Sequence, residues 1–142
     1  MSDERQRSVI WHGMFLFLLG LLTGLAEPHF SNPRMGLAAH LEGLMNGTFL
    51  IALGAVWLQL RLPAQMLSAT YWLALYGAYA NWGTTTFAAI VGAGSLSPIT
   101  GAGRTALPWQ ETLVTIGFAS VGLTILTASA VALWGFRRAA TA

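Results

Sequence analysis

Four long apolar segments occupy most of this 142-residue chain. A helix needs about 20 residues to cross the hydrocarbon layer of a bilayer, which is about 30 Å thick. The four segments are roughly Ser8–Ala26, Gly36–Leu60, Leu67–Ala93 and Leu107–Phe136. The connections between them are short, so no soluble domain fits there. We therefore predict a single all-α domain over residues 1–142, an integral membrane bundle of four transmembrane helices.

The composition agrees with this prediction. Charged residues make up 8% of the chain and hydrophobic residues 55%, and the mean hydropathy is +0.61. A soluble domain has about a quarter of its residues charged. The chain has no cysteine, which excludes disulfides, iron–sulfur clusters and thiol catalysis. This hydrophobic composition makes the lipid bilayer the expected partner. The net charge is only +2, so we expect no nucleic-acid partner.

The arginines predict the orientation, because an even number of spans leaves both termini on one side. That side carries Arg5, Arg7, Arg61, Arg137 and Arg138, and the other side carries Arg34 and Arg104. The positive-inside rule then places both termini in the cytoplasm of a bacterial inner (plasma) membrane. The first segment is too long for the apolar core of a signal peptide. Asp3 and Glu4 also reduce the positive charge that a signal peptide carries before this core, so we expect the segment to be retained.

The second segment carries the most unusual polar groups, since His40, Glu42 and Asn46 all fall within an apolar stretch. Ionisable groups are expensive at membrane depth and mark function by default. With a rise of 1.5 Å per residue, His40 lies about 6 Å into the membrane and Asn46 about 15 Å, near the midplane. We therefore expect the functional site of the chain in this segment.

Glycines recur on one face of the same segment. Gly36, Gly43, Gly47 and Gly54 stand at offsets of −4, +3, +7 and +14 from His40. At 3.6 residues per turn these positions share a face. Two interpretations are open: close helix–helix packing of the small-xxx-small kind, or a planar ligand lying beside the imidazole. Both hold if the ligand sits at a helix–helix or subunit interface.

Glu42 is rotated by about 200° from His40 and points elsewhere. Asn46, four residues after Glu42, lies on the same face as Glu42. One interpretation is a carboxyl that is kept neutral or is hydrogen-bonded to Asn46 for packing. The other makes Glu42 an anchor behind the site or a proton carrier.

The third segment brings Tyr76, Tyr79 and Asn81 to the middle of the membrane. Tyrosines in membrane spans are most often interfacial. These lie near the midplane instead, so both packing and a hydrogen-bonding role stay open. Tryptophans near the predicted ends need only the aromatic-belt explanation: Trp57, Trp72, Trp109 and Trp134. His12 lies about 6 Å from the cytoplasmic surface and does not reach the depth of His40.

Two stretches of the chain resemble the hydroxylaminobenzene mutase family. They are Asn32-Pro33-Arg34-Met35-Gly36-Leu37-Ala38-Ala39-His40-Leu41-Glu42-Gly43-Leu44-Met45-Asn46-Gly47 and Trp72-Leu73-Ala74-Leu75-Tyr76-Gly77-Ala78-Tyr79-Ala80-Asn81-Trp82. The later Gly101-Ala102-Gly103 and Pro108-Trp109-Gln110-Glu111 fit as well, so the resemblance runs from Trp11 to Arg137. More distantly, His40 and Asn46 resemble the histidine and asparagine of the styrene oxide isomerases, which are also small four-helix membrane proteins.

The near resemblance implies an isomerase that acts on a small aromatic substrate. Its reaction would shift a hydroxyl from nitrogen to the ring, turning hydroxylaminobenzene into 2-aminophenol. The distant resemblance implies haem b, with His40 as the axial ligand of the iron, and a homotrimer with haem at subunit contacts. The small residues beside the ligand would then be Gly36, Gly43 and Gly47.

In the mechanism that these resemblances imply, haem iron acts as a Lewis acid on the N-hydroxyl oxygen. Asn46 and Tyr79 would orient that oxygen, with Tyr76, Asn81 and Glu42 as helpers. A water-poor cavity would prevent attack by bulk water at other ring positions.

Two other classes stay open at this point. A haem-binding electron-transfer subunit normally needs two axial ligands, and His29 in the outer loop is the only candidate partner for His40. A cofactor-free small transporter or assembly protein would use the polar groups as a permeation path.

Overall fold

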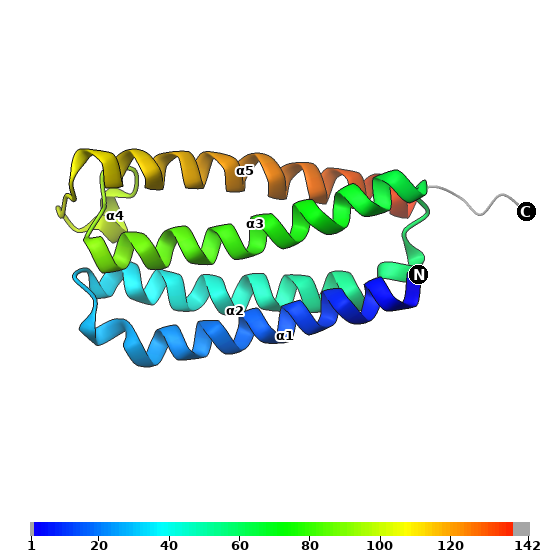
Figure 1. Cartoon of the computed structure of the whole chain (residues 1–142), viewed down its shortest axis with the longest axis horizontal. Coiled ribbons are helices and arrows are strands. Elements are labelled where there is room, and N and C mark those ends of the chain that lie inside the picture. Colours follow the sequence, from blue (N-terminus) through cyan, green and yellow to red (C-terminus); the bar gives the residue numbers. More distant parts are fainter. Residues whose placement is uncertain (1, 138–142) are drawn as a thin grey trace, which may run out of the picture.

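The computed structural model describes residues 2–137 and consists of four long helices (Figure 1). They are α1 (Ser2–Ala26), α2 (Pro33–Ala55), α3 (Ala64–Val91) and α5 (Pro108–Arg137). Three short elements connect them: the 3₁₀ helices η1 (Glu27–His29) and η2 (Trp57–Gln59), and α4 (Pro98–Gly101). The described residues contain no strand, which confirms the all-α prediction. Arg138, counted above in the charge bias, lies outside the described residues.

The long helices run side by side along the long axis of the molecule (Figure 1). α1 and α2 form a closely packed antiparallel pair, α3 lies against both, and within residues 2–137 α5 packs extensively only on α3. The helices α1, α2 and α3 therefore pack on one another, and α5 joins them through α3. The start of α1, the end of α5 and the α2–α3 connection lie at one end of the molecule, as an even number of antiparallel helices predicts (Figure 1). Which end faces the cytoplasm stays a prediction.

A single buried asparagine holds the opposite end together. Asn32 is 1% exposed and caps α2, accepting a hydrogen bond from the N–H of Met35 at 3.2 Å. Its side-chain amide donates to the carbonyls of Thr100 at 2.9 Å and Gly101 at 3.2 Å, and its backbone N–H donates to Ala89 at 3.0 Å. The ends of α2 and α3 and the α4 turn are thereby fixed relative to one another.

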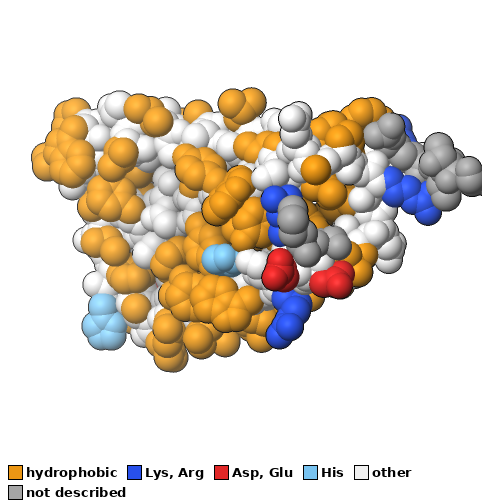
Figure 2. All heavy atoms as spheres, turned by 45° about the vertical axis from the view of Figure 1, so that its right-hand side comes forward, with side chains coloured by type: hydrophobic (Ala, Val, Ile, Leu, Met, Phe, Trp, Pro, Cys, Tyr) orange, Lys and Arg blue, Asp and Glu red, His pale blue; other side chains and the backbone are white. Residues whose placement is uncertain are grey.

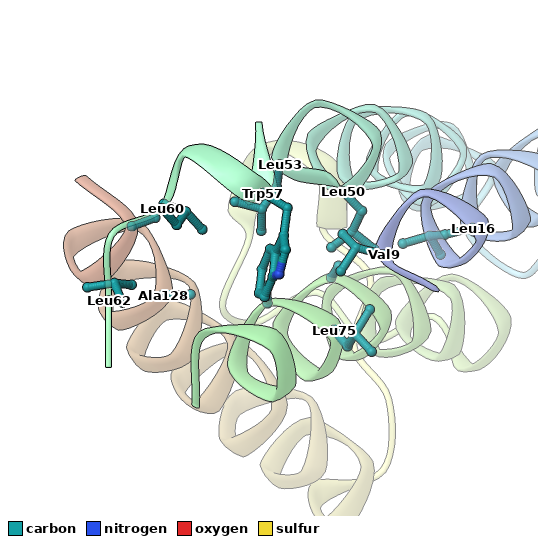
Figure 3. Packing of buried hydrophobic residues seen from close by; sticks show 12 residues of the cluster. Val9, Leu16, Leu50, Leu53, Trp57, Leu60, Leu62, Leu75 and Ala128 are labelled. Carbon is teal, nitrogen blue, oxygen red and sulfur yellow. The ribbon is translucent and has the colours of Figure 1, made fainter. Parts of the chain in front are cut away.

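The second helix ends at Ala55, whereas the expected span continued to Leu60. The chain leaves the helix through η2, and this turn carries the indole of Trp57 into the apolar core, where it is 2% exposed (Figure 3). The aromatic-belt interpretation of Trp57 is therefore wrong, because the ring points inward. The other three tryptophans of that prediction are exposed: Trp72, Trp109 and Trp134.

The contact between α1 and α2 is made by glycines whose backbones touch. A Cβ added to Gly43 would overlap the backbone of Gly20, and one added to Gly47 would lie 2.7 Å from the carbonyl oxygen of Gly13. Close approach of this kind is how helices pack where lipid removes the hydrophobic driving force. Apolar side chains from all four long helices fill the core nearer the chain ends (Figure 3).

The exterior of the molecule is largely apolar. Large hydrophobic side chains are exposed on every long helix, and Figure 2 shows them over most of the visible face. Two helical stretches, Asp3–His29 and Pro108–Arg137, are long and apolar enough to cross a membrane. Soluble monomers rarely expose apolar patches this extensive. The surface therefore favours a lipid environment over water.

The glycine contact gives a first prediction. Gly43→Ala should lower the free energy of unfolding by about 1–3 kcal/mol, because the new methyl group forces α1 and α2 apart. Gly122→Ala is the matched control, since a Cβ there meets nothing within 4 Å. It should leave stability unchanged or raise it by up to about 1 kcal/mol through helix propensity. Unfolding in detergent micelles measures both, and equal losses would contradict the packing role of Gly43.

Candidate active site

His40 lies in the second turn of α2 and faces α1. Its Nδ1 is 2.8 Å from the carbonyl oxygen of Gly20. A carbonyl only accepts, so Nδ1 carries the hydrogen and donates it. The ring fits because Gly24 has no side chain: a Cβ there would lie 2.5 Å from Nδ1. In the neutral imidazole Nε2 then holds the lone pair, and it accepts no hydrogen bond from the described residues.

This arrangement suits a histidine that binds a metal through Nε2. Ligating histidines usually donate the other ring N–H to a carbonyl or carboxylate, which fixes the ring and its tautomer. Within residues 2–137 no group of three or more histidine, aspartate or glutamate side chains could hold a metal ion. The donors present therefore fit a prosthetic group that needs one protein ligand better than a bare ion that needs several.

The glycines around His40 pack against the chain itself. Gly43 and Gly47 contact the backbone of α1, and a Cβ on Gly36 would lie 3.0 Å from the side chains of Glu27 and Phe30. The face that these glycines form is filled within one chain. The packing interpretation therefore describes the structure, and the part of these glycines in holding a cofactor stays a prediction.

Glu42 faces α3 instead of α1. Its Oε2 accepts a hydrogen bond of 2.5 Å from the hydroxyl of Thr85, a side chain that is 1% exposed. The alternative of a bond to Asn46 is wrong, since Thr85 takes that place and the Asn46 amide nitrogen has no partner. The other carboxyl oxygen, Oε1, accepts no hydrogen bond from the described residues and is not fully buried.

Asn46 carries an unpaired donor on the same face of α2, one turn beyond Glu42. Its Nδ2 is buried without a hydrogen-bond partner, alone in this respect among the side-chain atoms of residues 2–137. Leaving a buried donor unpaired costs about 1–3 kcal/mol. Such groups are rare in native proteins and need a reason. An acceptor on a bound ligand would supply the missing partner.

The tyrosines lie elsewhere. The hydroxyl of Tyr79 is 3.0 Å from Nδ1 of His12 and 3.3 Å from its carbonyl oxygen, so it is bound to α1. His12 precedes Gly24, which contacts His40, by a distance of about 18 Å along the helix axis. Tyr76 is 52% exposed and shares a 2.9 Å hydrogen bond with Ser120 on α5. Neither hydroxyl is bonded to Asn46, and a catalytic role for either stays a prediction.

Asn81 is half-buried on α3, and its carbonyl oxygen lies 3.0 Å from the Thr85 hydroxyl, whose single hydrogen is shared between this carbonyl and Glu42. No hydrogen bond of its side chain is found among the described residues. Its role at the site stays a prediction.

Several residues of the site were missed from the sequence. Gly20 and Gly24, which accommodate His40, form a small-xxx-small pair that could have been read as a packing face. Thr85 is one of several neighbouring threonines, and no pattern within α3 indicates that Glu42 is its partner. Trp82 donates from Nε1 to Thr23 at 2.9 Å and joins α3 to α1 beside Gly43.

The helices have an apolar exterior, and α2 carries a histidine with a free Nε2 and a partly unpaired polar cluster, so the structure is that of a small helical protein with a candidate site on α2. The chain matches the family model described as styrene oxide isomerase over residues 5–137, and it belongs to that family.

Two curated relatives come from Ectopseudomonas oleovorans. Hydroxylaminobenzene mutase HabB is 46% identical over 134 residues, covering 94% of this chain and 82% of HabB. Hydroxylaminobenzene mutase HabA is 44% identical over 127 residues, covering 89% of this chain and 94% of HabA. No solved structure matches the chain. Both resemblances stated from the sequence are confirmed, and the chain is an isomerase. The electron-transfer and transporter alternatives are therefore set aside.

Two buried asparagines give a matched prediction. Asn46→Leu keeps the branched shape and removes an unpaired donor, so it should raise the free energy of unfolding by about 1–3 kcal/mol. The same change should lower kcat of the isomerase by about 100-fold, the usual loss for a donor to a reacting oxygen. Asn32→Leu should lower stability by at least about 2 kcal/mol, because the side chain of Asn32 is fully paired. Destabilisation by Asn46→Leu would show that its amide has a structural partner.

Proposed function

We propose that this protein is a membrane-embedded mutase that rearranges hydroxylaminobenzene-type N-aryl hydroxylamines to 2-aminophenols. The observation that carries the proposal is the 46% identity to HabB across 94% of the chain. His40 and Asn46, the two residues that first indicated a site, both have a free polar atom available to ligands.

The four long helices span a bacterial inner membrane, with both termini in the cytoplasm. Support comes from the exposed apolar side chains, from the two helical stretches able to cross a membrane and from the arginine bias. Neutral aromatic substrates partition into bilayers, so a site at this depth is reached from the lipid.

The rearrangement is neutral in protons and electrons overall. The N–O bond breaks and a C–O bond forms at the ortho carbon. The nitrogen gains one hydrogen and that carbon loses one. The site must stabilise the oxygen as it leaves the nitrogen, and it must exclude water, because bulk water attacking the para position would give a different aminophenol.

Each residue of the site then has a defined task. His40 would hold haem b through Nε2, and the iron would supply Lewis-acid chemistry. Gly20 and Gly24 orient the imidazole, the first by its carbonyl and the second by its missing side chain. Asn46 donates its unpaired N–H to the oxygen that migrates. Tyr79, Tyr76 and Asn81 would help to orient that oxygen. Both tyrosine hydroxyls would have to leave their present partners, His12 and Ser120, to do so.

The protein would act as a homo-oligomer, a trimer by resemblance. Within one chain His40 faces α1 while Glu42 and Asn46 face α3, on different sides of one helix. His40 is half-buried, so its Nε2 is available near the surface of a single copy. A second copy covering this surface would enclose the site and exclude water from it.

The test is product analysis together with absorption spectra of the detergent-purified protein from cells supplied with haem. Wild type should yield 2-aminophenol from hydroxylaminobenzene and show a Soret band. His40→Ala should lose both. Gly24→Ala, which displaces the imidazole, should lower haem affinity or activity by about 10- to 100-fold, while Gly122→Ala should leave both unchanged.

Three results separate the parts of the proposal. A wild type that leaves hydroxylaminobenzene unchanged would overturn the proposed reaction. An active but colourless wild type would remove haem and leave a cofactor-free mutase. A His40→Ala variant that retains its Soret band would remove His40 as the ligand.

A further inference from the structure

The polar contact between α2 and α3 offers one free acceptor and one free donor. Thr85 occupies Oε2 of Glu42, and Oε1 is left without a partner and not fully buried. One turn away on the same face, Nδ2 of Asn46 is buried and unpaired. A ligand that satisfies both atoms must carry a donor and an acceptor close together.

The substrates named for this family differ in this property. The family model is described by styrene oxide, whose epoxide oxygen accepts hydrogen bonds but has no hydrogen to donate. The relatives are named for hydroxylaminobenzene, whose –NH–OH group has two donors beside an acceptor oxygen. Asn46 could serve either oxygen. The free oxygen of Glu42 is useful only to a ligand with an N–H or O–H.

We propose that Glu42, positioned by Thr85, accepts a hydrogen bond from the N–H or O–H of the substrate and makes this site prefer N-aryl hydroxylamines over epoxides. The inference rests on the proposed function for where the substrate binds. A site built to bind a donor disfavours analogues that lack one, because its acceptor is then left unpaired.

Thr85 can fix the carboxyl because its hydroxyl is buried between two acceptor oxygens and directs its one hydrogen to the nearer of them. It is 1% exposed and lies within hydrogen-bond distance of both Oε2 of Glu42, at 2.5 Å, and the carbonyl of Asn81, at 3.0 Å. Without this hydroxyl the carboxyl is free to rotate toward Asn46, whose N–H would then pair with it. The free donor and the free acceptor would be lost together.

The competing explanation is that the Glu42–Thr85 bond only packs α2 on α3. In that case its removal should weaken every ligand alike, through a disturbed helix contact. Selective weakening of ligands that carry donors is expected only if Glu42 binds them directly. Both explanations predict weaker binding when the Glu42–Thr85 bond is removed. They differ in whether ligands with donors are weakened more than ligands without them.

The experiment measures binding of two probes to the full chain in detergent by calorimetry. The probes are 2-aminophenol, which carries N–H and O–H donors, and styrene oxide, which carries none. Glu42→Leu should raise the Kd of 2-aminophenol by about 10- to 100-fold and leave that of styrene oxide unchanged. The kcat/KM for hydroxylaminobenzene should fall by a similar factor.

Matched variants separate the acceptor from the shape of the side chain. Glu42→Gln keeps an acceptor oxygen and should stay close to wild type for both probes. Thr85→Val should approach Glu42→Leu, and Thr85→Ser, which keeps the hydroxyl, should restore binding of 2-aminophenol. If Glu42→Leu does not fold, as judged by helical content and elution volume, the binding of both probes is compared between Thr85→Val and Thr85→Ser instead.

Equal weakening of both probes in Glu42→Leu and Thr85→Val, or no change in either probe, would overturn the inference and leave a packing contact. A wild type that binds styrene oxide as tightly as 2-aminophenol would also overturn it, even if hydroxylaminobenzene is rearranged. A wild type with the expected preference but no rearrangement would instead overturn the proposed function and leave the preference standing.

Discussion

The direct backbone contact between α1 and α2 is the constraint on which the rest of the site depends. Glycines on both helices let the backbones of α1 and α2 touch at Gly20 and Gly43, and at this close approach Nδ1 of His40 lies 2.8 Å from the carbonyl oxygen of Gly20. In lipid, packing of this kind replaces the hydrophobic effect as the force between helices. The carbonyl of Gly20 then selects the tautomer of His40, so a helix-packing feature determines which ring nitrogen is available for chemistry.

The same contact explains why the polar groups of α2 are divided between two faces. One face is taken by α1, so a side chain at Glu42, rotated by about 200° from His40, can only be directed toward α3. The hydroxyl of Thr85 meets it there. A single helix therefore carries the imidazole of His40 on one side and the polar groups of Glu42 and Asn46 on the other, and under the proposed function the first would hold a prosthetic group and the second would bind the substrate. Such a division favours a site that is enclosed by more than one element or copy.

Much of this could be predicted from the sequence, and the remainder has a physical reason. The four helices follow from run lengths, and His40, Glu42 and Asn46 stood out because polar groups are costly in apolar segments. The partners did not follow, since the periodicity within one helix carries no information on its register against another. Thr85 and Gly24 were missed for that reason, and Tyr79 was assigned to the site although it reaches His12. Trp57 was misplaced because α2 ends at Ala55 and the turn points the ring inward.

The unpaired amide of Asn46 contrasts with the fully paired side chain of Asn32. Asn32 is 1% exposed, and its N–H, carbonyl, side-chain oxygen and amide nitrogen all have partners. The chain can thus satisfy a buried amide where the amide has a structural task. Nδ2 of Asn46 is buried without a partner, and an unpaired donor is costly when it is shielded from water. Under the proposed function, a ligand with a matching acceptor would pair this donor, and the cost of leaving it unpaired would then favour the bound state.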